Sequence, residues 1–138
     1  MRLGLRNIRS LGDDWSAHFD AAREVGASDL QVDGIPAEDM EEVRALIDDT
    51  GVGIWAITAL SNCLLGPDEE QSANHQRNIR STVVQAAELG APCVTVWAGH
   101  NPELSIEENI TVFGEVFTPL AEHAAEHEVT LVLENCPM

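Results

Sequence analysis

The chain alternates short apolar runs with longer amphipathic stretches, and this rhythm constrains the fold more than any other feature. Strand-like runs are expected at residues 1–7, 29–33, 52–59, 92–97 and 129–134, with helical patterns between them. A strand, a helix and a further strand in this order form a right-handed parallel crossover. The sequence therefore predicts an α/β fold with four βα units plus a fifth strand. A complete eight-fold (β/α) barrel needs about 250 residues, so 138 residues predict an incomplete barrel, a single domain over residues 1–138 that forms its N-terminal half.

The end of the expected fifth strand leaves two interpretations open. An open five-stranded sheet would match the same element count, but such folds end with a helix that covers the last strand, and here only four residues follow it. An uncovered apolar strand promotes aggregation. We therefore expect either a missing C-terminal half or a partner chain, which could be a second copy.

Local residue patterns predict further properties of individual strands and helices. The run VGIWAITA at 52–59 is nearly all apolar, which is typical of a strand buried on both faces. Trp55 and Trp97 lie in strands and are expected in the core. Ser105 and Glu108 form the S-x-x-E pattern of a capping box at a helix start. Pro119 predicts a kink or break in that helix.

The charge excludes some classes of partner. The chain carries 24 acidic residues against seven basic ones, all arginine, and its net charge is −17. Such a field repels phosphate backbones and anionic membrane surfaces, so neither nucleic acid nor membrane is expected as a partner. Acidity without lysine resembles halophile proteins, although a merely acidic protein is an open alternative. The first residues are too few and too charged for a signal peptide, which makes the cytoplasm the expected location.

Polar residues stand where the expected strands end, which is where parallel α/β folds place their reactive groups. Glu134 in LVLEN could bind a divalent cation or move protons, but a solvated or arginine-paired glutamate is equally consistent with its position. His100 in WAGHN could bind a metal or a hydroxyl group, although a locally bonded loop histidine is the commoner case. Asn62 follows the third strand, and Trp97 could offer an apolar wall to a sugar ring.

Several well-known motifs are missing from the sequence. It contains no G-x-G-x-x-G dinucleotide loop, no G-x-x-x-x-G-K-[ST] phosphate loop and no G-x-S-x-G nucleophile elbow. Hydride transfer with a dinucleotide, nucleotide hydrolysis and serine hydrolysis therefore have no support from the sequence.

Three segments together carry a family resemblance: MRLGLRNIRS, AAELGAPCVTVWAGH and HEVTLVLENCPM. In this order they resemble the first half of the xylose-isomerase-like TIM-barrel family. The resemblance implies that Glu134 is the first ligand of a divalent metal (Mn, Mg, Co or Zn) and a proton-transfer carboxylate. It also implies that His100 lines the substrate or metal site. The other ligands of the family, typically an Asp, a His and a second Glu, come from strands six to eight.

The function implied by this resemblance is the isomerisation or epimerisation of a sugar or sugar phosphate. The family's chemistry is proton transfer next to a carbonyl, assisted by the metal. With most of the metal site missing, the chain by itself is expected to be inactive and to bind metal weakly or not at all. Relatives of endonuclease IV carry a histidine after strand three, where Asn62 and Cys63 stand here, which argues against DNA repair. A self-assembling non-catalytic half-barrel and a small-ligand binding module are the alternatives.

Overall fold

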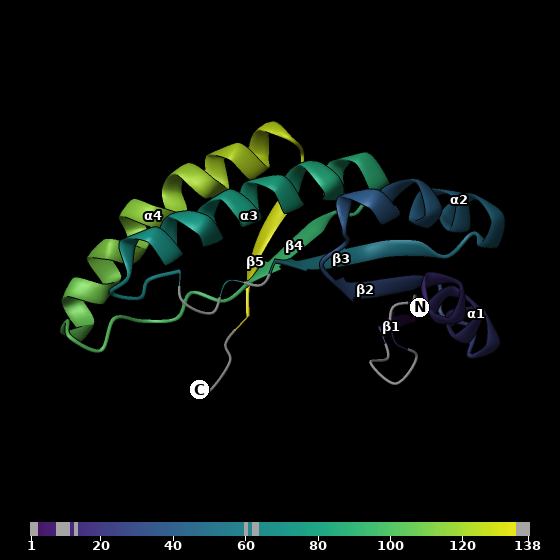
Figure 1. The fold of residues 1–138 in the computed structure, drawn as a ribbon, viewed down its shortest axis with the longest axis horizontal. Helices are drawn as coiled ribbons and strands as arrows, with labels where there is room; N and C mark the ends of the chain where they lie inside the picture. The colour runs from purple at the N-terminus through teal and green to yellow at the C-terminus, as the bar shows by residue number, and fades with distance from the viewer. Residues whose placement is uncertain (1–2, 8–11, 13, 60, 62–63, 135–138) are drawn as a thin grey trace.

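The structure, a computed structural model, describes residues 3–7, 12, 14–59, 61 and 64–134. Its centre is one five-stranded sheet in which all neighbouring strands run parallel, in the order β1-β2-β3-β4-β5 (Figure 1). The strands are β1 Gly4–Arg6, β2 Asp29–Asp33, β3 Gly53–Ala59, β4 Cys93–Val96 and β5 Thr130–Leu133. The predicted fold class, a partial parallel (β/α) barrel, is thereby confirmed.

Four helices connect these strands as right-handed crossovers require. They are α1 Trp15–Glu24, α2 Met40–Thr50 after a short 3-10 turn η2 Ala37–Asp39, α3 Glu69–Leu89 and α4 Ile106–Glu126. Side chains cap the starts of α1 and α3: the Asp14 carboxylate accepts from the Ala17 amide at 3.2 Å, and that of Asp68 from the Gln71 amide at 3.0 Å. None of the described helices is long and apolar enough to cross a membrane.

The expected capping box begins α4. The Glu108 amide donates to Ser105 Oγ at 3.2 Å, and the Ser105 amide donates to Glu108 Oε2 at 2.8 Å. The hydrogen bond from the Ser105 backbone, and then that from its side chain, hold the pKa of Glu108 below its usual value. A carboxylate whose pKa is lowered on folding stabilises the folded state above its unfolded pKa, and this stabilisation is lost as the pH falls through the folded pKa.

We therefore expect Glu108→Gln to lower stability at neutral pH but not in acid. Urea unfolding at a series of pH values should show that the difference in free energy of unfolding between wild type and variant shrinks as the pH falls through the lowered pKa. Glu107→Gln, one residue earlier on the same helix, is the matched control. If the difference in free energy of unfolding between wild type and Glu108→Gln stays constant with pH, the role of the ionised carboxylate is contradicted.

Pro119 lies inside α4, and the helix continues through it to Glu126, so the predicted break is wrong. Proline removes one helical hydrogen bond. The residues on either side are held from outside the helix, because Phe117 and Leu120 are buried in the core and an Arg80 Nη2 donates to the Pro119 carbonyl at 3.3 Å. Tertiary contacts therefore keep α4 in one piece.

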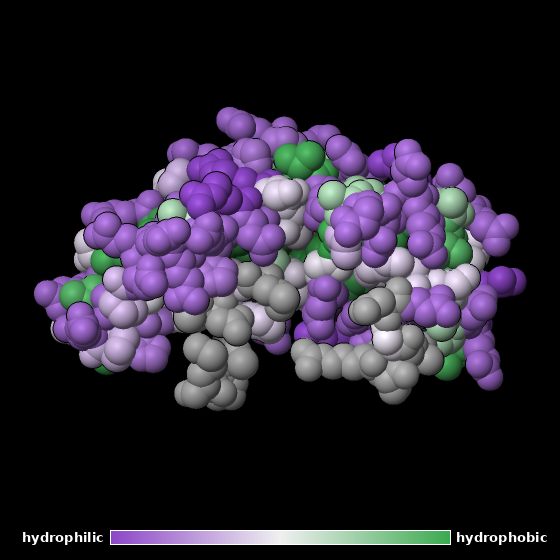
Figure 2. Space-filling view, in the orientation of Figure 1, coloured by the Kyte–Doolittle hydropathy of each residue, from purple (hydrophilic) through white to green (hydrophobic). Residues whose placement is uncertain are grey.

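The hydrophobic core fills the space between the sheet and its helices. Its fully buried side chains include Phe19, Leu30, Ile57, Ile79 and Leu120. The helices follow an arc along one side of the sheet, and no described helix covers the other side (Figure 1). The outer surface of these helices is mostly hydrophilic (Figure 2). We call the uncovered side the helix-free face.

Trp55 is not a core residue, because its side chain is 49% exposed. Leu30 pairs with Ile54 and Gln31 with Ala56, so Trp55 is an extra residue in β3 at this point of the ladder. Trp55 follows the core residue Ile54, so strand alternation places its side chain on the helix-free face, where it lines an open hollow. The prediction that the whole of residues 52–59 is buried on both faces is therefore wrong at Trp55.

Candidate functional site

The candidate site lies at the edge of the sheet where all the parallel strands end. Asn7, Trp97 and Glu134 directly follow β1, β4 and β5. The Asn7 amide donates to the Gln31 carbonyl at 2.8 Å, and the Glu134 amide donates to the Val96 carbonyl at 2.9 Å. The sheet ladder thus extends past the strand ends and holds these residues in register at one edge.

Glu134 lines an open hollow of about 380 Å³ on the helix-free face. The strand residues around it are mainly uncharged, and Arg6, Gln31, Thr95 and Val132 are among them. Glu134 Oε2 is buried and accepts no hydrogen bond from any described residue. Burying a carboxylate oxygen without a donor is costly, so this atom is suited to receive a proton, a ligand hydroxyl or a cation.

Two further atoms at the same edge are in a similar state. Asn7 Oδ1 and Trp97 Nε1 are buried, and neither has a hydrogen-bond partner within the described part of the chain. Together with Glu134 Oε2 they make two acceptors and one donor, each just past a strand end. Buried polar groups in proteins are nearly always satisfied, so these three groups, although they follow different strands, make the strand-end edge the candidate place for a ligand.

A metal would find one protein ligand among these residues. Glu134 fits that role, since a hard divalent cation prefers carboxylate oxygens. However, the described residues contain no group of three His, Cys, Asp or Glu side chains placed to hold a metal ion. Cys93 lines the same hollow, but burial raises the pKa of its thiol, which disfavours the thiolate form that binds metals. The described residues therefore supply one position of a metal site and not a whole site.

Ser61 fixes the backbone of Trp97. Ser61 Oγ donates to the Trp97 carbonyl at 3.0 Å and accepts from the Trp97 amide at 3.1 Å, and Ser61 is fully buried. One hydroxyl thus joins the segment after β3 to the end of β4. The Trp97 side chain is half-buried, so the expectation of a core position holds only in part.

We expect Ser61→Ala to lower the free energy of unfolding by about 1–3 kcal/mol, because it leaves the buried Trp97 amide and carbonyl without partners. Urea denaturation followed by far-ultraviolet circular dichroism measures this loss. Ser81→Ala, at an exposed position of α3, is the control and should stay within about 0.5 kcal/mol of wild type. Equal effects of the two substitutions would contradict the proposed role of Ser61.

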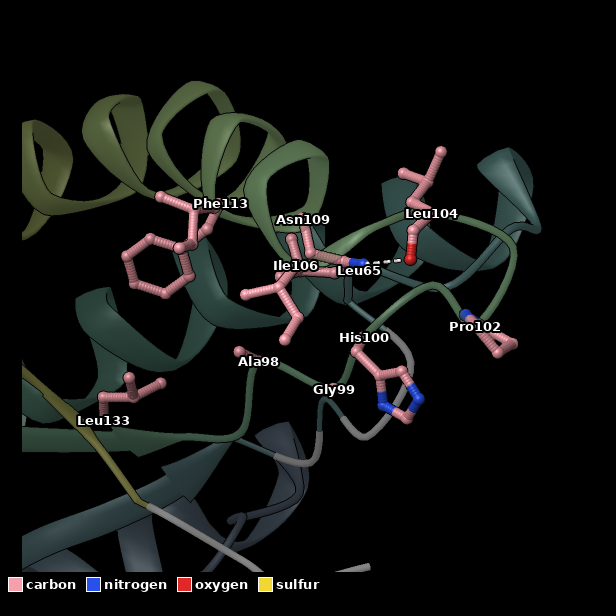
Figure 3. A pocket seen from close by; sticks show the side chains of 11 residues that line it. Leu65, Ala98, Gly99, His100, Pro102, Leu104, Ile106, Asn109, Phe113 and Leu133 are labelled. Carbon is pink, nitrogen blue, oxygen red and sulfur yellow. Dashed lines mark hydrogen bonds between the residues drawn. The ribbon is translucent and has the colours of Figure 1, made fainter.

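His100 lies in a loop held at both sides. The Leu65 backbone amide donates to the Ala98 carbonyl at 3.0 Å. Asn109 Nδ2, in the side chain, donates to the backbone carbonyls of Asn101, Leu104 and Ser105 at 2.9–3.2 Å. The imidazole is exposed and points away from Phe113 and Leu133 (Figure 3). It borders a second hollow, of about 550 Å³ and mostly apolar, that does not include Glu134.

The four residues predicted for the site are therefore only partly brought together. Glu134 and Trp97 share the sheet edge, whereas His100 borders the neighbouring hollow. Asn62 lies outside the described residues. Sequence reasoning missed Ser61 and Asn109, which position the loops, because nothing in the sequence near a serine or an asparagine shows what its side chain will bind.

The fold defines a class of protein: the described residues form part of a parallel (β/α) barrel, with unsatisfied polar groups at the C-terminal ends of its strands. Residues 8–138 match the family described as xylose isomerase-like TIM barrel. The chain belongs to this family. A search of curated proteins finds no significant match.

Solved structures show the same fold. The structure of 3-keto-D-glucoside 4-epimerase from E. coli matches with a TM-score of 0.85 at 20% identity, over 96% of this chain and 55% of that one. D-allulose 3-epimerase from Methylomonas sp., in complex with D-allulose, matches with a TM-score of 0.73 at 16% identity. The match covers 96% of this chain and 51% of that one. A xylose isomerase-like TIM-barrel protein from Mycobacterium smegmatis, in complex with magnesium, matches with a TM-score of 0.71 at 16% identity. The match covers 96% of this chain and 54% of that one. The chain thus spans about half the length of each.

Proposed function

We propose that this chain is the N-terminal part of a sugar or sugar-phosphate isomerase or epimerase. The observation that carries the proposal is the Glu134 carboxylate, which has an unsatisfied oxygen at the strand-end edge of a barrel of this family. A carboxylate held in such a place can act as a general base or acid. Proton transfer next to a carbonyl, the shared chemistry of isomerases and epimerases, needs such a group.

Each predicted residue has a proposed role. Glu134 moves a proton at the carbon next to the carbonyl and is one ligand of a divalent metal. Trp97, His100 and Asn62 contact the sugar. A bound metal would supply polarisation of the carbonyl oxygen. Its other ligands, and the remaining βα units, come from outside the described residues.

Several consequences of this proposal concern the chain as a whole. We propose that the 138-residue chain forms one domain, the N-terminal half of the barrel, and that it is inactive by itself and binds metal poorly. A cytoplasmic location and adaptation to high salt stay predictions from the sequence.

Exchange of carbon-bound hydrogen with solvent tests the function directly. Ketohexoses and their phosphates are incubated in deuterium oxide with the chain alone or with the chain joined to its C-terminal half, with Mn²⁺ or with a chelator. NMR should show deuterium at the carbon next to the carbonyl only with the joined protein and metal. Failure of the joined protein to exchange any of these sugars would overturn the proposal. Exchange by the chain alone would refute its proposed inactivity.

A small-ligand binding module is a second candidate, because the hollow of about 550 Å³ beside His100 is lined by apolar residues such as Leu104, Ile106 and Phe113. Hollows of this size and character accept small apolar ligands. Saturable binding of a fluorescent apolar probe, lost in Phe113→Asp but kept in an exposed variant such as Glu126→Gln, would favour this role.

A further inference from the structure

The end of α4 carries a pair of histidines that the proposed function does not use. His123 and His127 are four residues apart, so they lie on the same side of the helix. The centroids of their rings are 4.5 Å apart, and the ring planes are tilted by 56°. Both side chains are partly exposed, so an ion in solution has access to them.

The pair belongs to the seam between α3 and α4, which lie side by side (Figure 1). Nε2 of His123 lies 3.3 Å from the carbonyl oxygen of Arg80 on α3. The chain then enters β5 at Thr130, which is the opposite end of that strand from Glu134. The histidine pair is therefore separate from the strand-end edge and from the two hollows described above.

Backbone carbonyls fix which nitrogen of each ring carries the proton. A carbonyl oxygen only accepts, so Nε2 of His123 donates to the Arg80 carbonyl, and Nδ1 of His127 donates to the His123 carbonyl at 2.9 Å. In a neutral imidazole the nitrogen that does not donate carries a lone pair. The lone pairs are therefore on Nδ1 of His123 and Nε2 of His127.

This arrangement is the one that metal-binding histidines have in proteins. Such a histidine almost always donates its second ring nitrogen to a carbonyl or a carboxylate, which sets the tautomer and orients the ring. Both His123 and His127 already have this support from a backbone carbonyl. Each ring is therefore prepared to offer one nitrogen to an ion.

The distance between the rings also suits a single ion. A ligating nitrogen lies about 2.0–2.1 Å from Zn²⁺, so two imidazoles on one ion have ring centres about 4.5 Å apart for bonds at a right angle and about 5.2 Å for a tetrahedral angle. The observed 4.5 Å lies at the lower end of this range. The backbone of α4 therefore does not have to move for both rings to bind one ion.

The ligand type and the charge of the chain select the kind of ion. Imidazole suits Zn²⁺, Cu²⁺ and Ni²⁺, whereas Mg²⁺ and Ca²⁺ prefer oxygen ligands. The net charge of −17 attracts cations to the surface. Glu126 and Glu128, the two neighbours of His127 in the chain, are both exposed and add to the negative charge around the pair.

We propose that His123 and His127 together bind a divalent transition-metal ion such as Zn²⁺, through Nδ1 of the first and Nε2 of the second. Water completes the coordination, because the described residues place no third His, Cys, Asp or Glu side chain in a group with them. Two protein ligands hold an ion less tightly than the four of a structural zinc site, so the ion exchanges with solvent. The site does not rest on the proposed function, whose metal is bound at Glu134.

NMR of the ¹⁵N-labelled 138-residue chain, titrated with Zn²⁺, tests the site atom by atom. Long-range ¹H–¹⁵N spectra report each ring nitrogen, and we expect shifts at Nδ1 of His123 and Nε2 of His127 but not at His100. Zn²⁺ bound at Glu134 or at cysteine thiols does not shift these two nitrogens, so the result is independent of the proposed function. Unchanged signals of both rings up to about 1 mM Zn²⁺, or shifts at one of the two rings alone, overturn the proposal.

The substitutions His127→Gln and His100→Gln form a matched pair for measuring affinity. Each removes one imidazole that is not buried, and the His123 signal follows Zn²⁺ binding in both variants. We expect His127→Gln to bind at least about tenfold more weakly, because it loses the gain from two linked ligands, and His100→Gln to bind like wild type. Equal affinities of His127→Gln and wild type would show that the two histidines do not share an ion.

Discussion

Glu134→Gln is expected to lower the rate of proton transfer in the joined, complete enzyme by a factor of about 10²–10⁴, the usual contribution of a positioned acid or base. The amide has nearly the shape of the carboxylate but cannot take up a proton at neutral pH. The backbone bond from the Glu134 amide to the Val96 carbonyl does not involve the side chain, so the strand end should keep its place. The rate of deuterium exchange into the substrate measures the effect.

Two comparisons separate a chemical role of Glu134 from a structural one. Glu126→Gln, on the exposed side of α4, removes the same charge away from the site and should leave the exchange rate unchanged. Unfolding of Glu134→Gln should occur at the same urea concentration as in wild type or a higher one, since Oε2 is buried without a donor and the substitution removes no hydrogen bond to it. Full activity of Glu134→Gln would exclude Glu134 as the proton-transfer group.

Phe19→Ala is expected to have the largest effect on stability. Phe19 is fully buried in the core. Removing such a ring costs about 3–5 kcal/mol, because apolar burial is lost and a cavity is left behind. That is a large share of the roughly 5–15 kcal/mol by which domains of this kind are stable, so much of the variant should be unfolded at moderate temperature.

Val25→Ala is the control for Phe19→Ala. Val25 follows α1 and is 57% exposed, so its substitution should change stability by no more than about 0.5 kcal/mol. Urea unfolding at one protein concentration compares the two variants. A loss below about 1 kcal/mol at Phe19 would mean that α1 does not belong to the cooperative core.

Much of the fold could be predicted from the sequence because its signals are local. Asp68 begins a helix, and Gly90 ends the same helix with a φ of 69°. The reason is that a carboxylate can bind the first free amides of a helix, and glycine tolerates the left-handed conformation. The strand-end position of Glu134 was predictable in the same way, from an apolar run followed by a polar residue.

The errors arose where distant residues decide the outcome. Pro119 was expected to kink or break the helix, but α4 continues through it to Glu126, and Arg80, 39 residues away, binds its carbonyl. Trp55 was expected in the core, but its side chain lies on the face of the sheet that no described helix covers. Ser61 binds a residue 36 positions away. Nothing within a few residues of these positions carries that information.

The sequence by itself determined the alternation of strands and helices, the helix caps, the acidic surface and the polar residues that end the strands. These follow from contacts within one helical turn or one strand. Only the tertiary structure decided that Glu134 Oε2 lacks a partner, that His100 borders a different hollow, and that His123 binds the Arg80 carbonyl. The burial of a side chain and its hydrogen-bond partners depend on which segments distant in sequence are in contact. The packing of the helices on the sheet determines those contacts.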